Sequence, residues 1–417
     1  MVTDSDTSRV TLRDTGPDST SVSEPAPPRD PGVSHDSARD PGGHRDPARR
    51  PDVDHTIVQL LTSDGRRVHD RNYSPLADHL DSSALQGLYR DMVLVRRFDA
   101  EATALQRQGE LGLWAQSLGQ EAAQIGSGRA LRSQDYAFPS YREHGVAHTR
   151  GLDLASLLHL FRGLDHGGWD PAAHNFHLYT LVIGSHTLHA TGYAMAIQRD
   201  GDVGTGDADR DRAVVAYFGD GATSQGDVYE AMVFAAVNNA PVVFFCQNNH
   251  WAISEPTTRQ STVPLAQRAH GVGIPSVRVD GNDVLASYAV TIEALQRARE
   301  GGGPTMIEAI TYRMGAHTTS DDPTKYRSRA EEDLWRSRDP IDRMRTLLQA
   351  EGTDPGFFAE VDTEAEALAL RVRDYVRSLT PPPPQRMFEH VYATEHSLVS
   401  SERAWFDAYQ AGFGEAK

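Results

Sequence analysis

The 417-residue sequence has almost no cysteine, no long apolar run and no excess of basic charge. Its one cysteine, Cys246, cannot form an intramolecular disulfide, which excludes a disulfide-stapled secreted scaffold and favours a reducing compartment. No stretch approaches the roughly 18 apolar residues that cross a bilayer, and the N-terminus lacks the apolar core of a signal peptide. With 41 Lys and Arg against 58 Asp and Glu, the chain lacks the basic face that nucleic acids and anionic membranes require. We therefore expect a cytoplasmic protein that binds neither nucleic acid nor membrane.

The first 50 residues are also poor in core-forming side chains. They contain seven Pro, one Leu and no Phe, Tyr or Trp, so they cannot bury enough apolar surface to offset the entropy of ordering. We predict a disordered tail over 1–54, a folded domain over 55–380, and a C-terminal arm over 381–417. The arm begins with a proline spacer and continues as a helical segment.

Short apolar runs alternate with helical periodicity through the middle of the chain. We expect strands in 213–218, 241–246 and 305–314, a strand and then a turn within 276–283, and helices in 83–108, 227–238 and 284–299. This alternation implies βαβ crossovers and an α/β fold, in which a parallel sheet has helices on both faces. Thr363 and Glu366 form a capping-box pattern, which predicts a helix that begins there and runs to about Ser378.

Polar residues with catalytic or ligand chemistry follow three of these strands. Asp220 follows the first, Asn249 the second and His317 the last. In an open parallel sheet the loops at the carboxyl ends of the strands meet in one crevice, where ligands bind. Asp220 and Asn249 are one strand–helix–strand return apart, so we expect their side chains to reach one point.

The residue types at this point suit a metal–diphosphate site. A carboxylate and a carboxamide oxygen are hard ligands for Mg²⁺ that leave positions for water and phosphate oxygens. Gly219 and Gly221 allow the backbone to approach a phosphate closely, and the helix expected from about Gly226 directs N–H groups at an anion.

Longer motifs carry a family resemblance. The Gly219-Asp220-Gly221 turn followed by Asn248-Asn249 resembles the binding signature of thiamin-diphosphate enzymes. The stretches YREHG, GDGATSQGDVYEA, FFCQNNHWAIS and YRMGAHTTSDDPTKYR resemble the α subunit of the E1 component of 2-oxo acid dehydrogenase complexes. The similarity covers about residues 75–400, and VIGSHTLHATGYA and MGAHTTSDDP are most similar to the branched-chain type.

The resemblance implies a role for each matching residue. It implies the thiamin-diphosphate-binding fold, with Mg²⁺ held by the side chains of Asp220 and Asn249 and the carbonyl of Trp251. It places His317 beside both diphosphate and substrate, as the catalytic candidate. The other implied cofactor-binding residues are Tyr141 and Arg142 at the diphosphate, Ile183 at the rings, and Gly219, Gly221 and Ala222 along the cofactor.

Three positions depart from the family pattern. Gln247 stands where some members have an arginine before the Asn pair. Ser185-His186 replaces a Thr-Gln pair that is associated with a potassium site in the mammalian branched-chain enzyme. Thr318 stands at the mammalian phosphoserine position.

The resemblance also implies an activity and partners. The activity is oxidative decarboxylation of a branched-chain 2-oxo acid, with transfer of the acyl group to lipoylated E2 acyltransferase. An E1 β subunit would complete the site in an α2β2 heterotetramer, and the α chain alone would be inactive. The alternatives are a pyruvate dehydrogenase E1 α subunit and a catalytically silent assembly subunit; a self-contained transketolase needs a second domain that this length does not supply.

Overall fold

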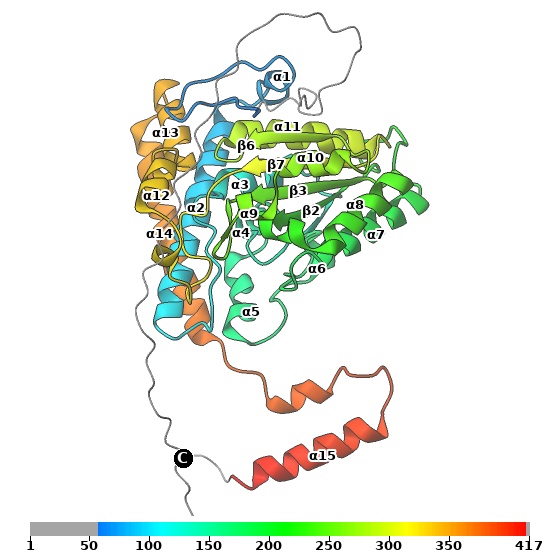
Figure 1. Ribbon diagram of the computed structural model, residues 1–417. Coiled ribbons are helices and arrows are strands. Elements are labelled where there is room, and N and C mark those ends of the chain that lie inside the picture. Colours follow the sequence, from blue (N-terminus) through cyan, green and yellow to red (C-terminus); the bar gives the residue numbers. More distant parts are fainter. Residues whose placement is uncertain (1–56, 414–417) are drawn as a thin grey trace, which may run out of the picture. The chain divides into compact units, whose positions relative to one another are not determined.

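A five-stranded parallel sheet lies at the centre of the computed structural model, which describes residues 57–413 (Figure 1). The strand order is β1-β2-β3-β7-β6, and every neighbouring pair is parallel. A separate antiparallel hairpin, β4-β5, follows β3. The strands are β1 (Tyr136–Phe138), β2 (Val214–Gly219), β3 (Val242–Asn248), β4 (Trp251–Ala252), β5 (Glu255–Pro256), β6 (Ser276–Asp280) and β7 (Thr305–Ile310).

Helices cover both faces of the sheet, which confirms the predicted fold class. Alternate residues of one strand belong to different cores: Val215 and Tyr217 pack on one face, and Val214 and Ala216 on the other. The first face is covered mainly by α2 (Ser82–Arg107), α3 (Glu121–Ala130), α4 (His144–Thr149) and α11 (Val284–Arg299). The second is covered by α7 (His186–Arg199), α8 (Gly226–Asn238) and α10 (Leu265–His270).

The remaining helices lie outside these two layers or extend the first. They are α1 (Ser74–Ala77), α5 (Leu158–Arg162), α6 (Pro171–His174), α9 (Thr257–Gln260), α12 (Arg329–Arg336), α13 (Pro340–Ala350), α14 (Pro355–Ser378) and α15 (Ser397–Ala411). One 3-10 turn matters for the site, because η2 (Asp220–Ser224) continues directly from β2.

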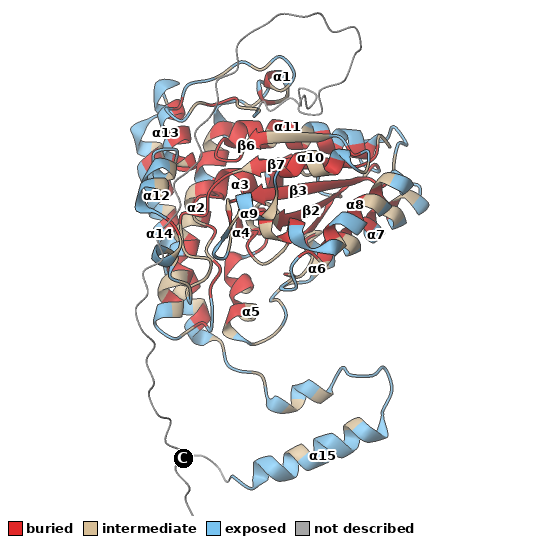
Figure 2. Cartoon of the chain, in the orientation of Figure 1, coloured by how far each residue is buried: buried red, intermediate tan, exposed pale blue. Residues whose placement is uncertain are grey.

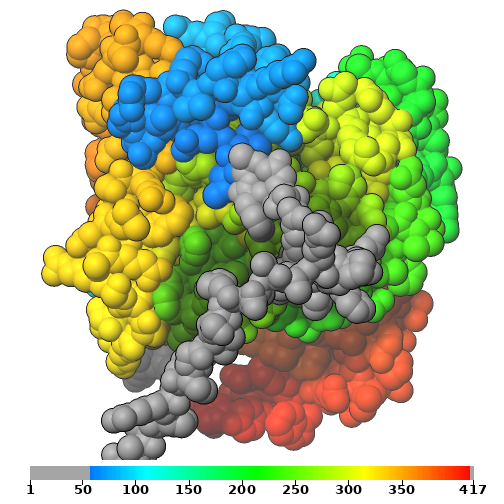
Figure 3. Space-filling view, turned by 45° about the horizontal axis from the view of Figure 1, so that its top comes forward, coloured from blue at the N-terminus to red at the C-terminus, as the bar shows by residue number. Residues whose placement is uncertain are grey.

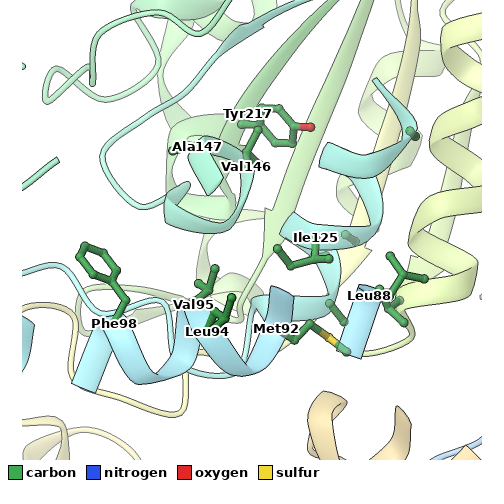
Figure 4. Close-up of a cluster of buried hydrophobic side chains, with 14 of the residues drawn as sticks. Leu88, Met92, Leu94, Val95, Phe98, Ile125, Val146, Ala147 and Tyr217 are labelled. Carbon is green, nitrogen blue, oxygen red and sulfur yellow. The ribbon is translucent and has the colours of Figure 1, made fainter. Parts of the chain in front are cut away.

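Helix α2 has the apolar spacing that the sequence predicted. Asp81 caps its first turn by accepting a hydrogen bond from the Ala84 N–H at 2.8 Å. Its buried side chains pack against α3 and α4 and also against α13 and α14, and Figure 4 shows Phe98 and Met92 among the buried residues. Complete burial of Phe98 contributes roughly 2–3 kcal/mol of hydrophobic stabilisation.

Two glycines let neighbouring helices approach α3 closely. A Cβ at Gly126 would lie 2.6 Å from the Val284 carbonyl oxygen, and one at Gly128 would lie 2.3 Å from Thr149 Oγ1. Because α3 is packed on all sides, nearly all of its residues are buried. Its sequence therefore shows little of the alternation of apolar and polar residues that marks a helix with one exposed face.

Two element boundaries were predicted wrongly. Strand β7 ends at Ile310 and not at 314. Helix α14 begins at Pro355, after Asp354, so Thr363 lies inside the helix and its hydroxyl donates to the Ala359 carbonyl at 2.8 Å. Glu366 forms an ion pair with Arg97 at 2.7 Å and takes no part in a cap. Pro at the first helical position explains the earlier start.

The segment before α1 packs against the C-terminal helices. Arg67 forms an ion pair with Glu351 at 2.7 Å, and Arg343 donates to the Leu61 carbonyl at 3.0 Å. The space-filling view shows this blue segment beside the orange one (Figure 3). The predicted 1–54 tail lies outside the described residues.

The C-terminal arm contains a helix, as expected. Helix α15 has no buried residue, and Figure 2 shows it mostly pale blue, with short tan patches. Trp405, Tyr409 and Phe413 form an exposed aromatic row on one side of it, with ring centroids 5.5 and 4.8 Å apart. Among residues 57–413, no helix is both long and apolar enough to cross a membrane.

Candidate active site

A cavity of about 350 Å³ is lined by residues that follow the carboxyl ends of β2, β3 and β7. This is the edge of a parallel sheet where ligands bind. The structure brings every residue predicted for the site to the wall of this cavity. They are Tyr141, Arg142, Ile183, Gly219, Asp220, Gly221, Ala222, Asn249, Trp251 and His317.

Asp220 is a buried carboxylate without a cationic partner. Only 1% of its surface is exposed. Its Oδ2 accepts hydrogen bonds from Gln260 Nε2 at 3.0 Å and Thr257 Oγ1 at 3.2 Å, both neutral donors. Burial raises the pKa of Asp220, and these two hydrogen bonds lower it in part. Within the described part of the chain Asp220 forms no ion pair, and the charge of Arg313 offsets the effect of burial on its pKa only in part, so a bound cation would stabilise this carboxylate.

Asn249 and Trp251 supply further oxygen atoms beside the cavity. Asn249 Oδ1 accepts from the Trp251 N–H at 3.2 Å, and Asn249 Nδ2 donates to Gln120 Oε1 at 3.2 Å. The Trp251 carbonyl accepts from Arg313 Nη1 at 2.6 Å. With Asp220 these groups form a carboxylate, carboxamide and carbonyl set, which is the oxygen chemistry that Mg²⁺ prefers.

Two cationic side chains, Arg142 and Arg313, also line the cavity. Arg142 Nη2 donates to the His317 carbonyl at 2.8 Å, and both Arg142 Nη2 and Arg313 Nη1 lie 3.4 Å from His317 Nδ1. Burial and the charges of Arg142 and Arg313 lower the pKa of His317 to about 3. Burial and the charge of Arg142 lower the pKa of Arg313 to about 10. Two guanidinium groups and a neutral imidazole therefore face one space, where an anion would offset their repulsion.

Arg313 is a site residue that the sequence reading missed. It lies within the quoted YRMGAH motif, four residues before His317, but neither its spacing nor its type distinguished it from a surface arginine. In the structure Arg313 is buried, and its Nε has no hydrogen-bond partner among residues 57–413. Its guanidinium also donates to the Ile253 carbonyl at 2.9 Å.

The loop that carries His317 is held from two sides. Asp321 Oδ2 accepts from the His317 N–H at 2.8 Å and from the Tyr326 hydroxyl. Arg327 donates to the carbonyls of Arg313, Met314 and Gly315. These bonds fix the backbone of His317 relative to β7, and Thr318 next to it is partly buried.

Gln247 belongs to a buried polar network. Its Nε2 donates to Glu143 Oε1 at 2.7 Å, and its Oε1 accepts from Gln124 Nε2 at 3.0 Å. Gln124 also donates to the Arg142 carbonyl at 3.0 Å. Burial raises the pKa of Glu143. The network therefore connects the end of β3 to the backbone of Arg142, and Glu143 and Gln124 are further residues that the sequence reading missed.

The second departure from the family pattern also has local partners. His186 Nε2 lies 2.6 Å from the Tyr217 carbonyl, and its Nδ1 has no hydrogen-bond partner within the described part of the chain. Ser185 Oγ donates to the Val182 carbonyl at 3.0 Å. Burial lowers the pKa of His186 to about 4, so this side chain is neutral near pH 7.

Comparison with known proteins defines the family. The model of the "Dehydrogenase E1 component" family matches residues 89–372. The chain belongs to this E1 family. It is 45% identical over 360 residues to the 3-methyl-2-oxobutanoate dehydrogenase subunit alpha of Mycobacterium tuberculosis. This match covers 85% of this chain and 94% of that protein. It is 39% and 40% identical over 298 residues to the pyruvate dehydrogenase E1 component subunits alpha of Staphylococcus epidermidis and Staphylococcus aureus; each match covers 71% of this chain and 77% of the relative.

Membership of the E1 family implies thiamin diphosphate as the cofactor, and the cavity of this E1 chain fits such a ligand. Arg142 and Arg313 supply the positive charge that a diphosphate needs. A Cβ at Gly221 would lie 2.8 Å from the Ala252 Cβ, so the turn after β2 has no room for a side chain at this position. Ile183, 41% exposed, gives the cavity an apolar side for the rings.

Proposed function

We propose that this chain is the E1 α subunit of a branched-chain 2-oxo acid dehydrogenase complex. One observation carries the proposal: a buried carboxylate without an ion pair, Asp220, lines the same cavity as Arg142, Arg313 and neutral His317. A cation and an anion bound together would neutralise both parts of the wall. The higher identity to the 3-methyl-2-oxobutanoate relative than to the pyruvate relatives supports the branched-chain substrate class.

Each side of the cavity has its own role in the proposal. Asp220, Asn249 and the Trp251 carbonyl hold Mg²⁺, and the guanidinium forks of Arg142 and Arg313 bind diphosphate oxygens. Tyr141, Gly219, Gly221 and Ala222 complete the wall along the cofactor, with Ile183 at its rings. Bound thiamin diphosphate supplies the electron sink for decarboxylation.

His317 acts as a hydrogen-bond donor to the substrate in this proposal. Its Nδ1 faces two guanidinium groups, which donate and do not accept, so Nδ1 is the acceptor and Nε2 carries the proton. The Nε2–H group is then available to an anionic oxygen of the 2-oxo acid. Arg142 holds the His317 carbonyl and so fixes where this donor lies.

The chain works with partners in the proposal. Leu181, Val182 and Ile183 are 57%, 66% and 41% exposed, and Tyr229 and Phe234 of α8 are exposed as well. Exposed apolar side chains beside a cavity indicate a surface that a partner covers. We assign it to an E1 β subunit in an α2β2 heterotetramer that passes its acyl group to lipoylated E2.

The free cysteine bears on the location of the protein. Burial raises the pKa of the Cys246 thiol, so this side chain stays protonated. A buried free thiol is compatible with a cytoplasmic location.

Reconstitution with the β subunit tests the proposal. With Mg²⁺ and thiamin diphosphate, we expect the pair to decarboxylate 3-methyl-2-oxobutanoate with a higher kcat/KM than pyruvate. A preference for pyruvate would point to the pyruvate dehydrogenase alternative. If the pair decarboxylates neither acid and calorimetry shows no heat of cofactor binding, the chain is a catalytically silent assembly subunit.

A further inference from the structure

Helix α9 contacts the carboxylate of Asp220 through two side chains. Thr257 and Gln260 are three residues apart, so both lie on one side of this short helix. Both donate to the same oxygen, Oδ2, at 3.2 and 3.0 Å. In the described part of the chain, no side chain donates to Oδ1 of Asp220. The two oxygens of this carboxylate are therefore in different environments.

The amide of Gln260 is oriented by partners on both ends. Its Nε2 donates to Asp220, and its Oε1 accepts from Ser224 Oγ at 3.2 Å. A carboxylate oxygen accepts and a hydroxyl donates, so this pair of partners is consistent with one orientation of the amide. Gln260 thus connects α9 to both ends of η2, the turn that carries Asp220.

The hydroxyl of Thr257 is part of a longer hydrogen-bonded chain. Thr257 Oγ1 lies 3.1 Å from Asn248 Oδ1 as well as 3.2 Å from Asp220 Oδ2. Asn248 Nδ2 donates to Glu308 Oε1 at 2.8 Å, and Glu308 Oε2 accepts from the Ala266 N–H at 3.0 Å. These hydrogen bonds connect the buried carboxylate of Glu308 in β7 to Asp220 at the cavity wall. They give Asn248 a role distinct from that of Asn249.

One proton serves two acceptors at Thr257. A hydroxyl donates a single hydrogen bond at a time, whereas Asp220 Oδ2 and Asn248 Oδ1 both accept. The carboxylate is the charged acceptor of the two, so the Thr257 hydroxyl donates preferentially to Asp220 Oδ2, and Asn248 Oδ1 lies within reach of the same hydroxyl.

We propose that Thr257 and Gln260 are positioning residues that orient the Asp220 carboxylate for a divalent cation. By bonding to Oδ2 they fix the rotation of the carboxylate and leave Oδ1 for the metal. This inference rests on the proposed function, because it assumes that Asp220 is a metal ligand. Partners that orient a ligating carboxylate typically change metal affinity by about 10- to 100-fold when they are removed.

Metal titration of the reconstituted α/β assembly tests the inference. The Mg²⁺ dissociation constant is measured by calorimetry at saturating thiamin diphosphate for wild type, Thr257→Val, Thr257→Ser and Thr258→Val. Thr257→Val is nearly isosteric and removes the donor, so we expect Mg²⁺ affinity to fall about 10-fold or more. Thr257→Ser keeps the hydroxyl and should stay within about threefold of wild type by the same reasoning. Thr258 is exposed on the same helix, and Thr258→Val should leave the affinity unchanged.

The outcomes separate this inference from the proposed function. If wild type binds Mg²⁺ and Thr257→Val binds it equally well, the positioning role is wrong and the proposed function stands. If wild type binds neither Mg²⁺ nor the cofactor, both are wrong. Gln260→Leu gives a second, independent removal of a donor to Oδ2 should Thr257→Val fail to assemble, and the same loss of Mg²⁺ affinity is expected. An unchanged affinity in Gln260→Leu would contradict the proposal.

Discussion

Arg313 holds Ile253 in a conformation that β-branched residues rarely adopt. Arg313 Nη2 donates to the Ile253 carbonyl at 2.9 Å, and Ile253 has a φ of 55°. The residue is the first of two that connect β4 to β5, where a two-residue hairpin turn favours glycine. An isoleucine that is 53% exposed gains little from burial in return. Strain of this kind persists where the surrounding structure fixes the backbone, as the two carbonyl bonds of Arg313 do here.

Ile253→Gly should therefore relieve strain. We expect it to be more stable than Ser254→Gly by about 1–2 kcal/mol, since a left-handed β-branched residue carries a cost of that size. Ser254 is the matched control, because it is the other turn residue and its φ is not positive. Urea unfolding of the two variants measures the difference. Equal free energies of unfolding would show that the conformation of Ile253 carries no strain.

The buried network around Gln247 should contribute to stability. Gln247→Leu would leave Glu143 Oε1 without its donor at 2.7 Å, and Gln124 Nε2 would keep only its bond to the Arg142 carbonyl, with one N–H unpaired. Unpaired buried polar groups cost roughly 1–3 kcal/mol each, so we expect the free energy of unfolding to fall by about 2 kcal/mol or more. Gln296→Leu, at an exposed position of α11, serves as the control. A loss no greater than that of the control would mean that the network adds nothing.

Asp99 should make stability depend on pH. Burial raises the pKa of Asp99 to about 7, although its Oδ1 accepts from Trp114 Nε1 at 2.8 Å and the Ser117 N–H at 3.1 Å. Because the folded protein holds this proton more tightly than the unfolded chain, the contribution of Asp99 is most favourable at acidic pH. It declines as pH rises from about 4 toward 7.

Asp99→Asn isolates that contribution. Asparagine Oδ1 can accept the same two hydrogen bonds and does not titrate. We expect the variant to gain stability relative to wild type between pH 5 and pH 8, as measured by urea midpoints at the two values. Other titrating groups cancel in this comparison. Parallel losses in both proteins would rule out a raised pKa at Asp99.

Arg142 should be needed for cofactor affinity more than for folding. Arg142→Gln removes one charge from the cavity and the donors to His317. We expect thiamin diphosphate to bind the α/β assembly about 10- to 100-fold more weakly, since a charge-assisted hydrogen bond contributes roughly 1.5–3 kcal/mol. Fluorescence titration at saturating Mg²⁺ gives the dissociation constants. Arg132→Gln, at an exposed position away from the cavity wall, should bind the cofactor like wild type.

The elements with regular periodicity could be predicted from the sequence, and those without it could not. Helix α2 and strands β2 and β3 each present a uniform pattern, and they form within a residue or two of the prediction. Helix α3 is buried almost all round and β1 has only three residues, so neither has a pattern to detect. Thr363 and Glu366 have the spacing of a cap, but the same spacing occurs inside helices.

The residues of the candidate site likewise fall into those that the sequence could predict and those that it could not. Residues at strand ends, such as Asp220 and Asn249, could be placed together because parallel strands end at one edge. Arg313, Glu143 and Gln124 become site residues through contacts with distant segments, which sequence spacing does not contain. The role proposed for Gln260 also depends on where α9 packs, since its partner lies 40 residues away.

Calorimetric titration of the α/β assembly with thiamin diphosphate and Mg²⁺, comparing wild type with Asp220→Ala, shows whether the Asp220 carboxylate is needed for cofactor binding. We expect saturable binding to wild type and no measurable heat with Asp220→Ala, in an assembly that keeps the wild-type circular dichroism spectrum. Equal binding by the two proteins would contradict it.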